Sequence, residues 1–354
     1  MPPANPTPAN HTPANPTPAN PTPAHATVPA TTRAVVQRRY GGPEQLELAE
    51  MPTPAPGDGQ VLLEVEAAAI DRGTWHLMTG LPLVVRLGFG FRGPRQPVPG
   101  LDVVGTVVAL GRGVSDLRVG DRVFGVADGS FATHAVADAH RLAVLPAGVD
   151  PLVAAAVPVS GGTAIQAVVD QGRVAPGQRV LVLGASGGVG SFAVQVAAAR
   201  GAIVTGTAST AKVAQVRTLG VPTVVDHTTT DPLAQPRAYD CIIDTGGRNP
   251  LRRLRRALTP DGTLVVVGGE GGGRVTGGFG RQLRAAALSP LVRQRLLMLF
   301  ARDTREVVER LGAMLVEGTL TPVVDRVVAL DGVADGLRAL AAGEVTGKVV
   351  VRVR

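Results

Sequence analysis

A run of four apolar residues followed by a glycine-rich turn, Val180-Leu-Val-Leu-Gly-Ala-Ser-Gly-Gly-Val-Gly190, is the segment that most constrains this fold. The apolar residues predict a buried strand, and the glycines allow a tight turn that brings the backbone close to a bound phosphate. Apolar residues then recur at helical spacing as far as Arg200-Gly201, a basic helix end followed by a stop. This order predicts a dinucleotide-binding site with the pyrophosphate at the N-terminus of the helix. The predicted contacts are Gly184, Ser186, Gly187, Gly188, Val189 and Gly190.

The whole chain divides by composition and periodicity into four parts. Residues 3–27 repeat a proline-rich unit of five residues, and we expect residues 1–32 to form a disordered, partly polyproline-II tail. Residues 33–158 contain short β-branched runs separated by turn residues, which predicts a β-rich domain. Residues 159–300 alternate strands with helices, and residues 301–354 are expected to return to the first domain. The predicted fold class is α/β, a Rossmann doubly wound parallel sheet beside a β-rich domain.

The cysteine content and hydropathy exclude several kinds of site. Cys241 is the only cysteine and lies in an apolar run, which excludes an intrachain disulfide and a thiolate cluster for zinc. This composition favours a reducing compartment, and we expect a cytoplasmic protein. No apolar stretch reaches the roughly 18 to 20 residues that span a bilayer, and the N-terminus lacks the features of a secretory signal. No membrane association is therefore expected.

The net charge of +7 comes almost entirely from arginine, because only Lys212 and Lys348 are lysines. The densest basic segment is 252–256, where leucines interleave with the arginines at helical spacing. Such a pattern is typical of a solvated helix face, and we prefer this interpretation to a polyanion-binding site. Nucleic acid is therefore not an expected partner.

Several motifs identify a resemblance that covers residues 33–354. The segment Pro97-Val-Pro-Gly-Leu-Asp-Val-Val-Gly105, followed by Val119-Gly-Asp-Arg-Val-Phe-Gly125, resembles a paired motif of the medium-chain dehydrogenase/reductase superfamily. The segments 150–166, 318–330 and 347–350 match further elements of that superfamily. The resemblance is closest to its zinc-free quinone oxidoreductase and NAD(P)-dependent alcohol dehydrogenase-like branch. It implies a GroES-like catalytic domain over 33–158, a Rossmann NADP-binding domain over 159–300, hydride transfer to a small-molecule substrate and a homodimer.

The resemblance also indicates how the cofactor is bound and whether a metal takes part. It adds Thr245, Gly268 and Lys348 to the expected cofactor contacts. Zinc-using members place a cysteine in the loop that here is 69–73, and a His-Glu pair where this chain has Leu101-Asp102. Because leucine cannot bind zinc, we predict a zinc-independent enzyme. Without a Lewis acid, activated acceptors such as quinones, enones or reactive aldehydes are favoured over simple alcohols.

The residues after the glycine-rich turn bear on the choice of nicotinamide cofactor. An NAD-preferring site needs a carboxylate about 20 residues beyond the turn, and the span from Gly190 to Val225 contains none. Ser209 and Lys212 instead offer a hydroxyl and a cation, and His227 falls where related reductases often carry a tyrosine that contacts the 2′-phosphate. We predict NADPH in preference to NADH. The alternative is that Ser209 only caps a helix and that Lys212 is solvated.

The loop 70–76 resembles the segment of the superfamily that forms the substrate pocket, with two departures. Asp71 stands at the usual asparagine position and Thr74 at the usual aspartate position. Asp71 is a candidate for orienting the nicotinamide ribose or pairing with Arg72, and Thr74 for hydrogen bonding to the acceptor oxygen. Trp75 would form a flat wall for a ring, and His76 is a candidate proton donor, although packing is its commoner role.

Two alternatives to quinone reduction stay open at this point. The first is an enoyl or 2-alkenal reductase, which would use the same machinery. The second is an NADPH-binding module without turnover, or a nucleic-acid-associated one, because the pocket motif is altered. The segment 281–300, divided by Pro290, is expected to cap the substrate cleft or to contribute to a dimer contact, and an amphipathic helix at a membrane surface is the lesser option.

Overall fold

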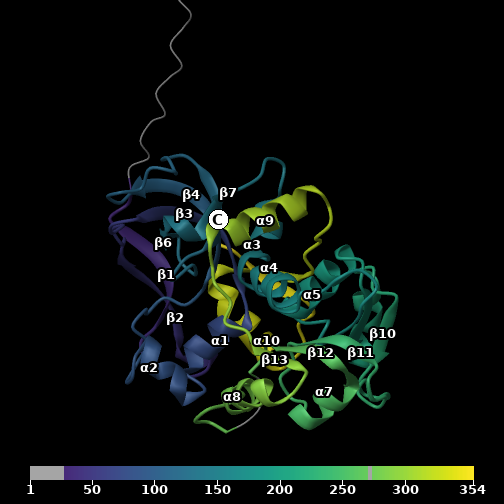
Figure 1. The fold of residues 1–354 in the computed structure, drawn as a ribbon. Helices are drawn as coiled ribbons and strands as arrows, with labels where there is room; N and C mark the ends of the chain where they lie inside the picture. Colours follow the sequence, from purple (N-terminus) through teal and green to yellow (C-terminus); the bar gives the residue numbers. More distant parts are fainter. Residues whose placement is uncertain (1–27, 270–272) are drawn as a thin grey trace, which may run out of the picture.

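The computed structural model describes residues 28–269 and 273–354. Six parallel strands form one sheet in the order β10-β9-β8-β11-β12-β13, in which the chain proceeds outward from β8 in both directions. Figure 1 labels four of these strands, β10, β11, β12 and β13. The strands are β8 (Arg179–Leu183), β9 (Ile203–Ala208), β10 (Thr223–Asp226), β11 (Tyr239–Asp244), β12 (Leu258–Val266) and β13 (Arg295–Met298). Four further helices belong to this region: α5 (Gly188–Ala199), α6 (Val213–Arg217), α7 (Leu251–Ala257) and α8 (Phe279–Leu288).

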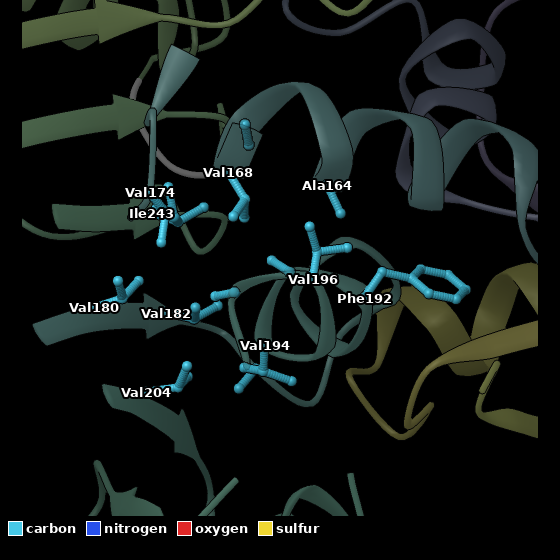
Figure 2. Close-up of a cluster of buried hydrophobic side chains, with 14 of the residues drawn as sticks. Ala164, Val168, Val174, Val180, Val182, Phe192, Val194, Val196, Val204 and Ile243 are labelled. Atoms are coloured by element: carbon cyan, nitrogen blue, oxygen red, sulfur yellow. The ribbon is translucent and has the colours of Figure 1, made fainter. Parts of the chain in front are cut away.

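Strand β8 is apolar on both faces because helices cover the sheet on both sides. Val180 and Val182 pack with Val194 of α5 in one buried cluster, shown in Figure 2. Leu181 and Leu183, which point to the other face, pack with Leu254 of α7 in a second cluster. Alternate residues of one strand thus enter two different cores. Helix α4 (Pro158–Ile165) and its π-helical continuation Gln166–Gln171 also cover the first face.

A second sheet of seven strands holds most of the N-terminal third of the chain. Its order is β14-β15-β3-β4-β5-β7, and β6 also pairs with β3. Its first members along the chain are β3 (Gln60–Ile70), β4 (Asp102–Leu110), β5 (Arg122–Val126), β6 (His134–Asp138) and β7 (Leu142–Val144). A separate antiparallel pair consists of β1 (Thr31–Gln37) and β2 (Leu46–Pro52). Three short helices complete this region: α1 (Arg72–Thr79), α2 (Arg86–Phe89) and α3 (Pro151–Ala155).

The end of the chain returns to this second sheet, as Figure 1 shows by the place of the C-terminus beside β3 and β4. Strand β15 (Lys348–Arg352) pairs antiparallel with β3, and β14 (Val324–Ala329) pairs parallel with β15. Helix α10 (Val333–Ala341) packs Val333 and Leu337 on Ile70 and Val349 in one buried cluster. Helix α9 (Arg305–Val316) buries Val308 and Leu311. The predicted doubly wound parallel sheet beside a β-rich domain is confirmed.

Two segments differ in detail from their predicted form. The segment 281–300 is a helix followed by the last strand of the parallel sheet, because Arg295–Met298, beyond Pro290, pair with β12. Of the predicted tail, residues 1–27 lie outside the described residues, whereas Thr31 and Thr32 already belong to β1. Within 28–269 and 273–354, no helix is long and apolar enough to cross a membrane.

Candidate active site

The glycine-rich turn joins the carboxyl end of β8 to the N-terminus of α5. Gly184 has a φ of +81°, a conformation that side chains disfavour, and its amide donates to Thr207 Oγ1 at 3.0 Å. A Cβ at Gly190 would lie 2.0 Å from the carbonyl oxygen of Gly184, so only glycine fits there. Gly187 is the N-cap residue of α5, and no side chain caps that helix end. The turn therefore leaves backbone N–H groups at a helix N-terminus, the arrangement that binds a pyrophosphate.

Thr245 and Gly268 lie beside this turn at the carboxyl edge of the same sheet. The hydroxyl of Thr245 donates to the carbonyl of Leu183 at 2.7 Å, and a Cβ at Gly184 would lie 2.7 Å from that hydroxyl oxygen. A Cβ at Gly268 would lie 2.0 Å from the carbonyl oxygen of Thr245. The structure thus brings these two predicted contacts together with Gly184, although they are distant in the sequence.

An ion pair that the sequence did not indicate supports this edge of the sheet. Asp244, the last residue of β11, is fully buried, and Arg281 of α8 donates to its carboxylate at 2.5 Å. Arg281 also donates to the carbonyl of Gly268 at 3.2 Å. Helix α8 therefore connects the end of β11 to Gly268, two residues after β12.

A segment of the second region, Gly343–Lys348, crosses to the glycine-rich turn, and we call these contacts the domain seam. The amide of Gly347 donates to the carbonyl of Ser186 at 2.8 Å. Lys212 Nζ donates to the carbonyls of Gly343 and Val345 at 2.6 and 2.7 Å, and burial lowers the pKa of this lysine. Lys212 is thus not the solvated residue of the alternative interpretation, because its ammonium joins the two regions.

Ser209 and His227 lie where the ends of β9 and β10 meet. The amide of His227 donates to the carbonyl of Ala208 at 3.0 Å, which places His227 next to Ser209. Ser209 is the N-cap residue of a short 3₁₀ turn, yet its side chain makes no capping hydrogen bond, contrary to the alternative interpretation. Asp226 accepts from Thr210 Oγ1 at 2.6 Å, and hydrogen bonds from hydroxyl groups hold its pKa below the usual range. This carboxylate directly follows the acid-free span and was not among the predicted residues.

Lys348 is buried beside the turn and paired with Asp102. Its ammonium donates to Asp102 Oδ2 at 2.8 Å and to Ser160 Oγ at 3.3 Å, and Lys348 is only 1% exposed. Val159 donates its amide to Asp102 Oδ1 at 2.7 Å. Burial raises the pKa of Asp102 to about 7, although Lys348 opposes that shift. The predicted cofactor contact Lys348 therefore meets Asp102 in this structure, which the sequence did not show.

The four residues predicted for the substrate pocket have different surroundings. Asp71 Oδ1 accepts from the amide of Thr74 at 2.7 Å and so caps α1, while Asp71 Oδ2 and Thr74 Oγ1 are buried without a hydrogen-bond partner among the described residues. Trp75 packs against the core cluster of Val333 and Leu337. His76 Nδ1 lies 2.9 Å from the carbonyl oxygen of Leu81. Asp71 and Thr74 thus each keep one polar atom without a hydrogen-bond partner among the described residues, whereas Trp75 and His76 make internal contacts.

The residues at the expected metal position do not fit zinc. A Cβ at Gly73 would lie 3.6 Å from Leu101 Cδ1, so an apolar side chain fills the space next to Asp71. Asp102 is already bound to an ammonium group. Cys241 is buried in β11, and burial raises the pKa of its thiol to about 12. In the part of the chain that the structure describes, no group of three His, Cys, Asp or Glu side chains is placed to hold a metal ion.

Comparison with known proteins places this geometry in a family. Residues 57–147 match the model of the alcohol dehydrogenase GroES-like domain, and residues 219–351 match that of a zinc-binding dehydrogenase. Human quinone oxidoreductase is 30% identical over 90% of this chain and 97% of its own length. The chain belongs to the quinone oxidoreductase-like branch of the medium-chain dehydrogenase/reductase superfamily. This confirms the resemblance and the GroES-like assignment.

Two further relatives cover nearly the same residues. A chloroplastic quinone oxidoreductase of Triphysaria versicolor is 28% identical over 90% of this chain and 98% of its own length. The solved structure of the quinone oxidoreductase from Coxiella burnetii superposes with a TM-score of 0.78 at 27% identity, covering 92% of this chain and 100% of the other. The chain is therefore an NAD(P)H-dependent oxidoreductase, and it shares its fold with a quinone oxidoreductase over 92% of its length.

Proposed function

We propose that this protein is a zinc-independent, NADPH-dependent oxidoreductase that reduces quinones, enones or reactive carbonyls. The observation that carries the proposal is the Lys348–Asp102 pair at 2.8 Å, which lies beside the cofactor turn where zinc-using members of the superfamily place a metal ligand. Without a Lewis acid at this position, the acceptor must already be electron-poor. The bound cofactor would supply the hydride, and the turn from Gly184 to Gly190 would hold its pyrophosphate.

The residues of this chain have separate tasks in the proposed reaction. Thr245 and Gly268 lie beside the glycine-rich turn and would border the bound cofactor there. Asp71 Oδ2 and Thr74 Oγ1 would hydrogen bond to the nicotinamide ribose and the acceptor oxygen, because each is buried and lacks a partner among the described residues. Holding both reactants in one orientation supplies most of the rate enhancement, and these polar groups add to it.

The preference for NADPH rests on the residues at the ends of β9 and β10. Ser209 and His227 would donate to the 2′-phosphate, and Lys212 would contribute a positive charge from the domain seam. Asp226 acts against the preference for NADPH, because its carboxylate lies beside Thr210 at the same strand ends and would repel a 2′-phosphate. We expect Ser209→Asp to reverse the ratio of kcat/KM for NADPH to that for NADH. An unchanged ratio would contradict the assignment.

One acceptor panel tests the reaction itself. The purified protein is assayed with NADPH and NADH against quinones, enones, 2-alkenals and simple ketones, with and without a metal chelator. We expect NADPH oxidation with activated acceptors and no effect of the chelator. Faster reduction of 2-alkenals than of quinones would assign the enoyl or 2-alkenal reductase alternative. Tight NADPH binding without oxidation would assign the non-catalytic alternative, and loss of activity to the chelator would contradict zinc independence.

The proposal also includes a homodimer located in the cytoplasm. The edge strand β13 leaves backbone groups that a second copy is able to pair with. Light scattering of the purified protein tests this state, and a mass of one chain would contradict it.

A further inference from the structure

A buried cluster of charged side chains lies beside the cofactor turn, and the hydride transfer does not account for it. Lys348 Nζ lies 2.8 Å from Asp102 Oδ2 and 3.8 Å from Asp71 Oδ2. The side chains of these residues are 1%, 0% and 5% exposed, respectively. One ammonium group therefore faces two carboxyl groups, away from water.

The charges of this cluster do not balance when every group is ionised. Two carboxylates and one ammonium leave a net negative charge in the interior, where an unpaired charge is costly. A bound proton removes that charge, as in other sites where two carboxyl groups lie close together. Burial raises the pKa of Asp102 to about 7, which supports proton exchange near neutral pH.

One further charged pair faces Asp71. Burial raises the pKa of Asp303, and Arg141 donates to its carboxylate at 3.2 Å. Arg141 offsets the charge of Asp303 and also pairs with Asp128. This pair therefore supplies no spare positive charge to the cluster.

The cluster lies close to the place where the cofactor's phosphates would bind. A Cβ at Gly188, in the first turn of α5, would lie 3.3 Å from Lys348 Cδ and 3.0 Å from Ser160 Oγ. Negative charge at the helix N-terminus would raise the pKa values of nearby carboxyl groups. Asp71 Oδ2 is 3.8 Å from Lys348, too far for a hydrogen bond, and has no other partner among the described residues. Asp71 is therefore the member of the cluster that is able to interact with a ligand.

We propose that Asp71, Asp102 and Lys348 form a proton-holding unit that takes up about one proton when the anionic cofactor binds and supplies it to the acceptor. The second step rests on the proposed function. In an enone, the β-carbon gains the hydride, the electron pair of the C=C bond moves toward the oxygen, and the α-carbon then bonds to the proton from Asp71. The acceptor is reduced and NADPH is oxidised to NADP⁺. The unit regains its proton from solvent when the next NADPH binds.

Calorimetric titration with NADPH tests the uptake step without any turnover. Binding heats are measured at pH 8 in two buffers with different heats of ionisation, and their difference gives the number of protons taken up. At this pH the 2′-phosphate, with a second pKa near 6, is fully ionised and contributes little. A group with a pKa of about 7 is then mostly ionised. We expect uptake of about 0.5 to 1 proton by the unaltered protein.

Two variants separate the unit from its surroundings. The double variant Asp102→Asn/Lys348→Met removes Asp102 together with its counter-charge and leaves Asp71 as the one carboxyl group of the cluster, and we expect proton uptake to fall to about zero. The matched double variant Asp261→Asn/Arg293→Met removes an exposed ion pair outside the cluster and should keep the uptake of the unaltered protein. The proposal is overturned if the unaltered protein binds NADPH without taking up a proton, or if the double variant takes up as many.

The transfer step is tested by turnover with the best acceptor of the panel. Asp71→Asn should lower kcat about 100-fold with little change in the acceptor KM, and should abolish the fall of kcat at high pH. An unchanged kcat and pH profile would overturn the donor role of Asp71. If no acceptor is reduced but proton uptake persists, the proposed function fails and the uptake step stands. If an acceptor is reduced but no proton is taken up, the proposed function stands and the uptake step fails.

Discussion

Two basic regions of this protein place their charges in opposite environments. In the first, helix α7, Arg252, Arg253 and Arg256 are exposed, while Leu254 is buried beneath them. Arg253 pairs with Asp231 at the surface. In the second, the domain seam, Lys348 is 1% exposed and faces the fully buried Asp102.

This difference shows that the density of charge along a sequence does not locate a site. Exposed ion pairs contribute about 0 to 1 kcal/mol, because water and salt screen them. Removing one partner of a buried pair costs about 3 to 5 kcal/mol, because the other charge stays unpaired. The interpretation of 252–256 as a solvated helix face agrees with the structure, and the deeply buried cation is one of only two lysines.

Lys348→Met should produce the largest effect, because it leaves Asp102 buried without its counter-charge. We expect the free energy of unfolding in urea to fall by about 3 to 5 kcal/mol near pH 8. The matched variant Arg256→Met on α7 should lower it by less than about 1 kcal/mol. Equal losses in the two variants would show that the seam and the helix face do not differ.

Gly190→Ala tests the close backbone contact in the glycine-rich turn. The added Cβ would lie 2.0 Å from the carbonyl oxygen of Gly184 and would force the turn apart. We expect NADPH affinity, measured by fluorescence titration, to fall about 100-fold, which corresponds to about 2.7 kcal/mol. Gly88→Ala, where the added atom meets nothing within 4 Å, should leave the affinity unchanged. A fall of less than threefold for Gly190→Ala would contradict the assigned turn.

The pH dependence of stability should also differ between the two regions. Because the pKa of Asp102 is raised to about 7 in the folded state, its contribution is present below the unfolded pKa, near 4, and is lost as the pH rises through 7. From pH 5 to pH 8, the free energy of unfolding in urea should therefore fall by more in the unaltered protein than in Asp102→Asn/Lys348→Met. Parallel losses would contradict the raised pKa.

Arg252→Gln together with Arg256→Gln should produce the smallest effect. Both side chains are exposed, and neither has an ion pair among the described residues. We expect the free energy of unfolding to change by less than about 0.5 kcal/mol and the NADPH affinity to stay the same. A threefold loss of affinity would give the α7 face a role in cofactor binding.

The sequence predicted the parallel sheet and the glycine-rich turn between β8 and α5 well, because both depend on neighbouring residues. In β8 and α5, apolar periodicity and glycine spacing act within about 20 residues. The roles at the loop 71–76 were harder to predict. Trp75 meets α10 and His76 meets Leu81, contacts that no local pattern records.

The sequence by itself therefore determined the fold class, the glycine-rich turn and the leucine at position 101, which is unable to bind zinc. Only the tertiary structure decided where the two lysines go. Lys212 reaches Gly343, and Lys348 reaches Asp102 across 246 residues of chain. The physical reason is that the energy of a charge depends on its burial and its partners, which distant segments supply when β15 returns to pair with β3.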